Sequence, residues 1–225
     1  MPLFLHKSNF LFRTVYPDFW WRIPVTDGQD PTIYLTFDDG PIPGVTEFVL
    51  GLLEEYAAQA TFFCIGDNVR KHRDVFYKVI EAGHMVGNHT FNHLNGWKTH
   101  DEVYWANIRK CERQMNVPTP LFRPPYGRIN KSQAEGIQND YSVVMWDVLT
   151  GDFDQSLSPQ TVLQKSIQYT EPGSIVVFHD SVKAWPNLQY VLPRYLAYFA
   201  ELGYQFRALP VKKNASRPLI LPRYA

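Results

Sequence analysis

Short apolar runs alternate with longer amphipathic segments along most of the chain, from about residue 32 to residue 208. The short runs are rich in β-branched and aromatic residues, a composition that predicts strands. Seven strands are expected, at 33–37, 61–65, 84–87, 121–123, 142–146, 174–178 and 204–208.

The longer segments carry apolar residues every three or four positions, which is the spacing of one helix face. Strong stripes predict helices over 45–56 and 188–199, and weaker patterns predict four more, at 69–81, 102–115, 131–138 and 159–169. Pro193 falls inside the second strong stripe, where it cannot donate a backbone hydrogen bond. A kink or a late helix start is expected there.

Strands separated by helices are typical of parallel βα units, and seven such strands nearly close a barrel. The chain has 225 residues, which is short for a complete barrel of eight units, and no break in composition divides it into two cores. We therefore predict an α/β fold, an incomplete (seven-stranded) parallel β/α barrel, over residues 31–210.

Residues 1–30 lie outside the alternation and form an aromatic N-terminal extension. Its aromatic residues are Phe10, Phe12, Tyr16, Phe19, Trp20 and Trp21. We expect them to cap the barrel floor or to fill its unclosed side, and a membrane-surface role is less favoured because Pro17 and Pro24 interrupt the segment. Residues 211–225 are basic and rich in proline, and are interpreted as a surface tail.

Charge and targeting signals narrow the class of partner. Lysine plus arginine and aspartate plus glutamate number 22 each, so no net field favours nucleic acid or an anionic membrane, and a small or neutral substrate fits better. The N-terminus lacks an uninterrupted apolar stretch, and no later run reaches membrane-spanning length. A soluble cytoplasmic protein without stable membrane insertion is expected, with two free buried thiols at Cys64 and Cys111. Its oligomeric state stays open.

Polar residues stand where the predicted strands end. In parallel α/β barrels these ends share one rim, where reactive residues gather. The residues are Asp38 and Asp39 after the first strand, His89 and His93 after the third, Arg123 at the fourth, Asp152 after the fifth, and His179 with Asp180 at the sixth.

Two of these groups suggest metal chemistry. His89 and His93 are four positions apart, so both imidazoles can face one ion from a helical turn, although such pairs are more often surface residues. Asp38 and Asp39 precede Gly40 and Pro41, which turn the chain sharply and hold both carboxylates in a fixed loop. One acid could bind metal while the other acts as a base, or both could be solvated acids of a turn.

Five segments taken together resemble a known family, the polysaccharide deacetylases of the NodB-homology type, also called carbohydrate esterase family 4. They are the TFDDGP of 36–41, the H-T-x-x-H of 89–93, the R-P-P-Y-G of 123–127, the segment 146–153 and the V-F-H-D of 177–180. Their order along the chain matches the family, from about residue 32 to residue 208. The resemblance implies a NodB-like barrel with one metal-dependent active site.

The resemblance also implies a role for each motif residue. The implied metal ligands are Asp39, His89 and His93. Asp38 would be the general base, oriented by Arg123, and the backbone amide of Tyr126 would stabilise the oxyanion. His179 would be the general acid, with Asp152 as its partner. Phe153 and Val177 would shape the pocket for the acetyl methyl group.

The expected reaction is removal of an acetyl group from an acetylated carbohydrate, with N-acetyl preferred over O-acetyl. The expected cofactor is a divalent metal. Zinc suits two imidazoles and one carboxylate best, and nickel, cobalt or manganese suit the same ligands.

Leu149, Phe153 and Val177 stand where family members often carry aspartate, tryptophan and leucine, which puts the substrate in doubt more than the reaction. One alternative is therefore a deacylase acting on a non-sugar amide. Another is a non-catalytic, metal-dependent sugar-binding protein, against which the joint retention of Asp38 and His179 argues, because binding alone needs neither a base nor an acid.

Trp97 and Trp185 follow segments of the predicted rim. Each could stack on a sugar ring or pack within its own loop, and the sequence does not separate the two.

Overall fold

The structure, a computed structural model, describes residues 5–8, 10–26, 28 and 30–211, and the predicted tail is therefore largely outside the described residues. In this part of the chain the strands are β1 (Thr32–Asp38), β2 (Thr61–Cys64), β3 (Met85–Asn88), β4 (Leu121–Phe122), β5 (Ser142–Val143), β6 (Val148–Leu149), β7 (Ile175–His179) and β8 (Gln205–Phe206). The helices are α1 (Phe10–Val15), α2 (Val45–Glu55), α3 (Gly66–Lys71), α4 (Arg73–Glu81), α5 (Asp101–Met115), α6 (Lys131–Glu135), α7 (Pro159–Tyr169) and α8 (Trp185–Glu201), with 3-10 turns η1 (Gly96–Lys98) and η2 (Pro125–Gly127).

The strands form one parallel sheet in the order β5-β4-β3-β2-β1-β7-β6, and β8 pairs with β1 beside this path. The predicted incomplete barrel of seven parallel strands is confirmed, although its membership differs from the prediction. The predicted strand at 204–208 is β8, off the path, and β6 was missed. Since β6 has two residues and no helix separates it from β5, the alternation of strands and helices cannot reveal it.

The two edge strands of this sheet, β5 and β6, are linked by residues 144–147 alone. This link has five Cα–Cα steps and spans at most about 18 Å, so the end of β5 and the start of β6 lie within that distance of each other. The barrel is thus open on one side only, and the chain itself crosses the opening.

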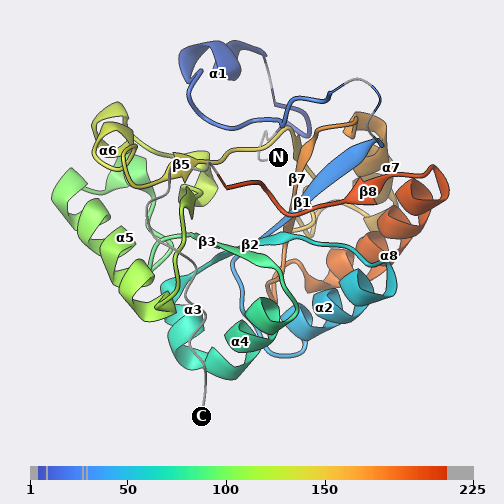
Figure 1. Cartoon of the computed structure of the whole chain (residues 1–225), viewed down its shortest axis with the longest axis horizontal. Coiled ribbons are helices and arrows are strands. Elements are labelled where there is room, and N and C mark those ends of the chain that lie inside the picture. The colour runs from blue at the N-terminus through green and yellow to red at the C-terminus, as the bar shows by residue number, and fades with distance from the viewer. Residues whose placement is uncertain (1–4, 9, 27, 29, 212–225) are drawn as a thin grey trace.

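The N-terminal extension lies along this opening. Trp20 forms a parallel bridge with Val144, while Lys7 forms an antiparallel bridge with Val148 on the other edge. Figure 1 shows the helices in an arc from α6 round to α7, with the extension and α1 across the remaining side. The extension therefore fills the unclosed side of the barrel, which is one of the two roles expected for it. The side chains of Phe10 and Phe12 lie outside the described residues.

A buried carboxylate anchors the extension. Asp147 is fully buried, and its Oδ2 accepts hydrogen bonds from Lys7 Nζ at 3.0 Å and from Ser174 Oγ at 2.6 Å. Its Oδ1 accepts a hydrogen bond from Arg13, and the Nε of Arg22 lies 3.5 Å from Oδ2. Three basic residues of the extension therefore converge on one acid of the barrel, a group we call the Asp147 cluster.

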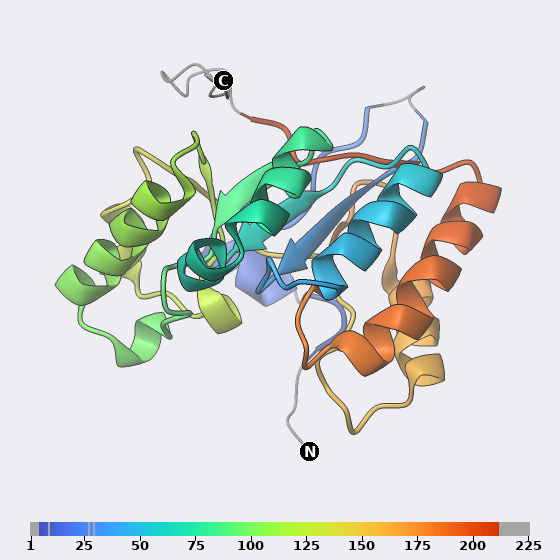
Figure 2. The same cartoon turned by 90° about the horizontal axis from the view of Figure 1, so that it is seen from below.

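The helices cover the outside of the sheet in a row from α5 through α4 and α2 to α8 (Figure 2). The stripe predicted for α8 is buried throughout, at Leu188, Val191, Leu192, Tyr195, Leu196 and Phe199. The expected late start at Pro193 is wrong, because α8 begins at Trp185 with Pro186 in its first turn, where a proline needs no backbone donor. The helix predicted over 69–81 is two helices, since His72 leaves helical geometry between α3 and α4.

None of the helices in the described ranges combines the length and apolarity needed to cross a bilayer.

Candidate metal and catalytic site

The turn after β1 sets the geometry of the first two acids. Asp39 has a φ of 83°, and the N–H of Gly40 donates to Asp180 Oδ1 at 3.0 Å. A Cβ at Gly40 would lie 1.9 Å from Asp180 Oδ2, so only glycine fits here. The second oxygen of Asp180 accepts from Thr46 Oγ1 at 2.6 Å, and burial raises the pKa of Asp180 to about 8. The sequence placed Asp180 on the rim without a role, and the structure shows it holding this turn.

Asp39, His89 and His93 converge into one cluster. The Nε2 atoms of His89 and His93 lie 3.8 and 3.3 Å from Asp39 Oδ1, and the three ligand atoms lie within 4.8 Å of one another. His89 follows β3 directly, and His93 reaches the cluster from a loop residue with a φ of 55°. Among the described residues, this is the only group of three such side chains close enough to share an ion.

Hydrogen bonds to Nδ1 fix which nitrogen each imidazole presents. His89 Nδ1 donates to the carbonyl oxygen of Arg123 at 2.8 Å, which leaves a lone pair on Nε2. His93 Nδ1 lies 3.1 Å from the hydroxyl of Tyr126. Burial lowers the pKa of His89, and burial together with the neighbouring His89 lowers the pKa of His93 to about 4. Both rings are therefore neutral at pH 7, as metal ligands must be.

The cluster fits a divalent ion. Two ligands bound at about 2.1 Å in a tetrahedral site lie roughly 3.4 Å apart, close to the separations between Asp39 and the two imidazoles. Asp39 Oδ1 is buried and has no hydrogen-bond partner, an arrangement that costs free energy unless a cation is bound. Outer partners such as Tyr126 and the Arg123 carbonyl are typical of histidine ligands.

Asp38 lies beside the cluster but is held from the opposite side. Arg123 donates to Asp38 Oδ1 at 2.7 Å, while Oδ2 lies 3.9 Å from His89 Nε2. Burial alone would raise the pKa of Asp38, but the charge and hydrogen bond of Arg123, together with the charge of His179, hold it below its ordinary value. Asp38 is thus a carboxylate with one oxygen fixed and the other facing the cluster.

Arg123 is fully buried, and its guanidinium donates four hydrogen bonds. Besides Asp38, it donates to Thr36 Oγ1 at 2.7 Å and to the carbonyl oxygens of Val144 and Met145 at 3.3 and 2.9 Å. This network holds the guanidinium in one orientation, which fits the orienting role that the sequence suggested. The part played by Thr36 was missed, because a threonine within a strand has no distinguishing pattern.

His179 lies at the end of β7 and is held by Asp152 through two contacts. Asp152 Oδ1 accepts from His179 Nδ1 at 2.8 Å, and Oδ2 accepts from the His179 backbone N–H at 2.7 Å. Burial alone would lower the pKa of His179, but the charge and hydrogen bond of Asp152 raise it to about 9. Nδ1 therefore carries a proton, and Nε2 carries a second one at neutral pH.

The remaining predicted residues also lie at this rim. Tyr126 sits in η2 with a φ of 60° and is 61% exposed, and its ring packs edge-on against His93 at 4.6 Å. Phe153 packs edge-on against His179 at 5.0 Å, while Val177 is fully buried in β7. The family resemblance implied a role for the backbone of Tyr126, whereas its hydroxyl was missed because no spacing rule links it to His93.

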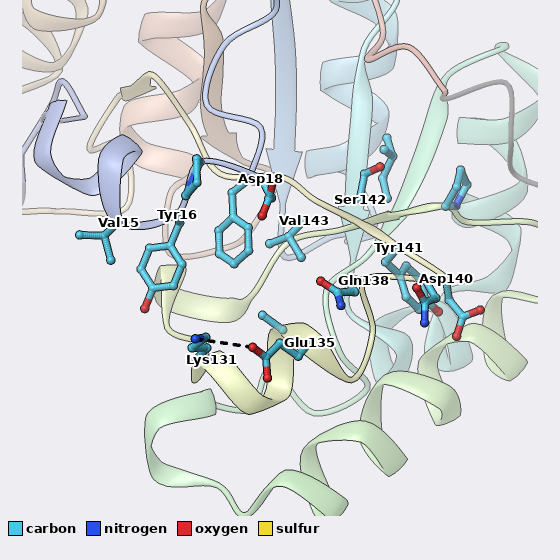
Figure 3. Close-up of a pocket in the computed structure, with 16 residues that line it drawn as sticks. Val15, Tyr16, Asp18, Lys131, Glu135, Gln138, Asp140, Tyr141, Ser142 and Val143 are labelled. Carbon is cyan, nitrogen blue, oxygen red and sulfur yellow. Dashed lines mark ion pairs between the residues drawn. The ribbon is translucent and has the colours of Figure 1, made fainter.

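A separate pocket of about 630 Å³ lies between the N-terminal extension and α6 (Figure 3). Its wall includes Phe19, the starts of β4 and β5 at Leu121 and Ser142, and the ion pair between Lys131 and Glu135. Because it reaches the N-terminal ends of strands, it lies away from the rim where the acids and imidazoles meet. It contains none of the predicted site residues.

Comparisons with known proteins point to one family. A family model described as polysaccharide deacetylase matches residues 26–143, more than half of the chain. A peptidoglycan-N-acetylglucosamine deacetylase of Bacillus cereus is 32% identical over 192 residues, covering 83% of this chain and 88% of the relative. Chitin deacetylase 2 of Saccharomyces cerevisiae is 33% identical over 164 residues, covering 68% of this chain and 51% of the yeast protein.

Among solved structures, a peptidoglycan N-acetylglucosamine deacetylase in complex with 4-naphthalen-1-yl-N-oxidanyl-benzamide superposes with a TM-score of 0.81. It is 28% identical, and the match covers 88% of this chain and 94% of that chain. The chain spans only 56% of a further Bacillus cereus deacetylase that is 32% identical over 154 residues. Several relatives thus extend well beyond the region they share with this chain.

Proposed function

Because this chain belongs to the polysaccharide deacetylase family, we propose that it hydrolyses N-acetyl groups on a polysaccharide and releases acetate. N-acetylglucosamine units are the proposed substrate, since relatives that act on peptidoglycan and chitin share this unit. The observation that carries the proposal is the cluster of Asp39, His89 and His93 with Asp38 on one side of it.

Asp39, His89 and His93 would hold the ion, and zinc suits this donor set best, with nickel, cobalt or manganese as alternatives. When bound, a divalent ion supplies a Lewis acid that polarises the acyl carbonyl and lowers the pKa of water to about 7. The protein contributes neutral imidazoles fixed by Arg123 and Tyr126, and one carboxylate oxygen left without a hydrogen bond.

Asp38 is the proposed general base. Arg123 occupies Oδ1, so Oδ2 is the oxygen that accepts a proton from the attacking water. The lowered pKa of Asp38 keeps this carboxylate ionised at neutral pH. The backbone N–H of Tyr126 is the proposed donor to the carbonyl oxygen as negative charge develops there.

His179 is the proposed general acid. An amine leaves poorly until its nitrogen is protonated, and the raised pKa of His179 keeps a proton on Nε2 at pH 7. Asp152 holds Nδ1, so Nε2 is the nitrogen that donates to the departing amine. Phe153 packs against this ring and limits its movement.

Acetate release tests the proposal. The protein is assayed with oligomers of N-acetylglucosamine, with O-acetylated sugars and with simple N-acetyl amides, each with chelator and after zinc is restored. Release from the N-acetyl oligomers that chelator abolishes and zinc restores is expected. Preference for the simple amides would instead support a non-sugar deacylase. No release from any compound by metal-loaded protein would contradict the proposal and favour a sugar-binding protein.

A further inference from the structure

Trp97 is an exposed tryptophan whose ring is nevertheless held in place. The residue is 61% exposed, yet its Nε1–H donates to the carbonyl oxygen of Ile129 at 3.2 Å. Its backbone N–H donates to Asn95 Oδ1 at 3.1 Å, and the guanidinium carbon of Arg128 lies 5.2 Å from the ring centroid. Single exposed apolar residues are common. A ring that is already ordered, however, loses little entropy when a ligand stacks on it.

The turn that carries this ring is itself fixed. The buried side chain of Gln133 donates from Nε2 to the carbonyl oxygens of Gly96 and Thr99 at 3.0 and 2.9 Å. A Cβ at Gly96 would lie 2.5 Å from the carbonyl oxygen of Arg128, so the two segments are in close contact. Trp97 therefore projects from a rigid support.

The ring lies next to the proposed active site. Trp97 follows the metal-ligand candidate His93 by four positions, and its partners Arg128 and Ile129 follow Tyr126, whose hydroxyl contacts His93. Two residues of chain span at most about 7 Å. The indole is thus on the same rim as the cluster, held by the segment that directly follows Tyr126.

A surface hollow of about 880 Å³ adjoins Trp97. Its lining includes side chains of both charges and an amide, at Lys98, His100, Asp101, Glu102 and Asn130. This volume lies within the range of ligand sites. An aromatic plane ringed by hydrogen-bonding groups matches a pyranose ring, which presents an apolar C–H face and a rim of hydroxyl groups.

We propose that Trp97 is the platform of a saccharide subsite that binds the sugar ring next to the one being deacetylated. This subsite rests on the proposed function, because a polymeric substrate extends past the reacting unit along the rim. Lys98, Asp101 and Asn130 are then the groups that hydrogen-bond this second sugar.

The subsite is tested by comparing kcat/KM for the pentasaccharide and the monosaccharide of N-acetylglucosamine. Trp97→Ala is expected to lower the ratio of the two values about three- to tenfold, and Trp97→Phe to keep most of it. The matched control is Tyr198→Ala, which removes a 42% exposed aromatic residue of α8 and leaves the ratio at the parent value. A ratio unchanged in Trp97→Ala overturns the subsite.

A second measurement does not depend on the folding of Trp97→Ala. The indole N–H signal of Trp97 is identified by NMR as the one that is absent from the Trp97→Phe spectrum. This signal is then followed in Asp38→Asn protein during addition of pentasaccharide. The signal is expected to shift and to saturate, and a constant signal overturns the subsite. If the parent releases no acetate from any substrate while this signal shifts, the proposed function fails and the subsite stands.

Discussion

Two buried aspartates, Asp38 on the rim and Asp147 at the open side of the barrel, are both compensated by arginine but in different ways. Asp147 has both oxygens engaged, by Arg13 on Oδ1 and by Lys7 and Ser174 on Oδ2. Asp38 has Arg123 on Oδ1, while its Oδ2 faces His89 at 3.9 Å. Both oxygens of Asp147 thus accept hydrogen bonds, whereas Oδ2 of Asp38 can still take up a proton.

This difference separates a structural role from a chemical one. A buried charge is tolerated only when it is paired and hydrogen-bonded, and Asp147 meets both conditions with groups from the extension and from the barrel. Asp38 is paired on one side alone, so a proton can reach its second oxygen. We infer that the Asp147 cluster contributes to stability, whereas Asp38 contributes to turnover.

Replacing Asp38 by asparagine should have the largest effect on activity. Asp38→Asn keeps an acceptor for Arg123 but cannot take up a proton, so kcat/KM for acetate release should fall about a hundredfold to ten-thousandfold. The melting temperature and the zinc content should stay near those of the parent. Activity within about tenfold of the parent would contradict the role of Asp38 as base.

Replacing Asp147 should have the opposite effect. Asp147→Ala leaves Lys7, Arg13 and Arg22 without their buried partner, so the free energy of unfolding should fall by about 1–3 kcal/mol. Denaturant unfolding measures this change, and kcat/KM of the folded fraction should stay within a few-fold of the parent.

The matched control for the Asp147 variant is Glu135→Gln, which breaks an exposed ion pair with Lys131. Such pairs contribute about 0–1 kcal/mol, so this variant should unfold almost as the parent does. Equal destabilisation by the two variants would show that the Asp147 cluster does not anchor the extension.

A third buried acid, Asp152, differs from both because it acts through His179. The acid form of His179 exists below its pKa of about 9, so activity that needs it should be lost as pH rises through about 9. Asp152→Asn removes the charge that raises this pKa, and the alkaline limb of kcat/KM should move down by more than about one pH unit. If the alkaline limb of the kcat/KM profile stays in place, a group other than His179 controls it.

The smallest expected effect concerns an exposed partner of the cluster, Tyr126. Tyr126→Phe removes the hydroxyl next to His93 Nδ1 and should weaken zinc affinity about tenfold, measured by competition with a chromogenic chelator. Melting of the metal-free variant should match that of the metal-free parent. Unchanged affinity would show that the hydroxyl does not orient His93.

The rim was predictable from the sequence because its residues follow strand ends, and parallel strands bring those ends together. Asp39, His89 and His93 could therefore be grouped from spacing and resemblance before any distance was known. The Asp147 cluster could not, because the acid and its basic partners are more than 100 residues apart and follow no periodic pattern. Lys7 and Arg13 were informative in the sequence only as charges that interrupt an apolar stretch.

The open side of the barrel was equally hard to predict in detail. The two-residue strand β6 is too short for a pattern of its own, and its pairing with β7 appears only in three dimensions. The same holds for the bridges of Trp20 and Lys7 to the sheet edges.

The position of the bound metal decides whether Asp39, His89 and His93 form the metal site. Crystals soaked with zinc and measured at the zinc absorption edge should show one anomalous peak about 2.0–2.2 Å from an oxygen of Asp39 and from Nε2 of His89 and His93. Asp38 should stay outside this shell, with its Oδ1 on Arg123. A peak coordinated by Asp38, or no peak at these three side chains, would contradict this division of roles between Asp38 and Asp39.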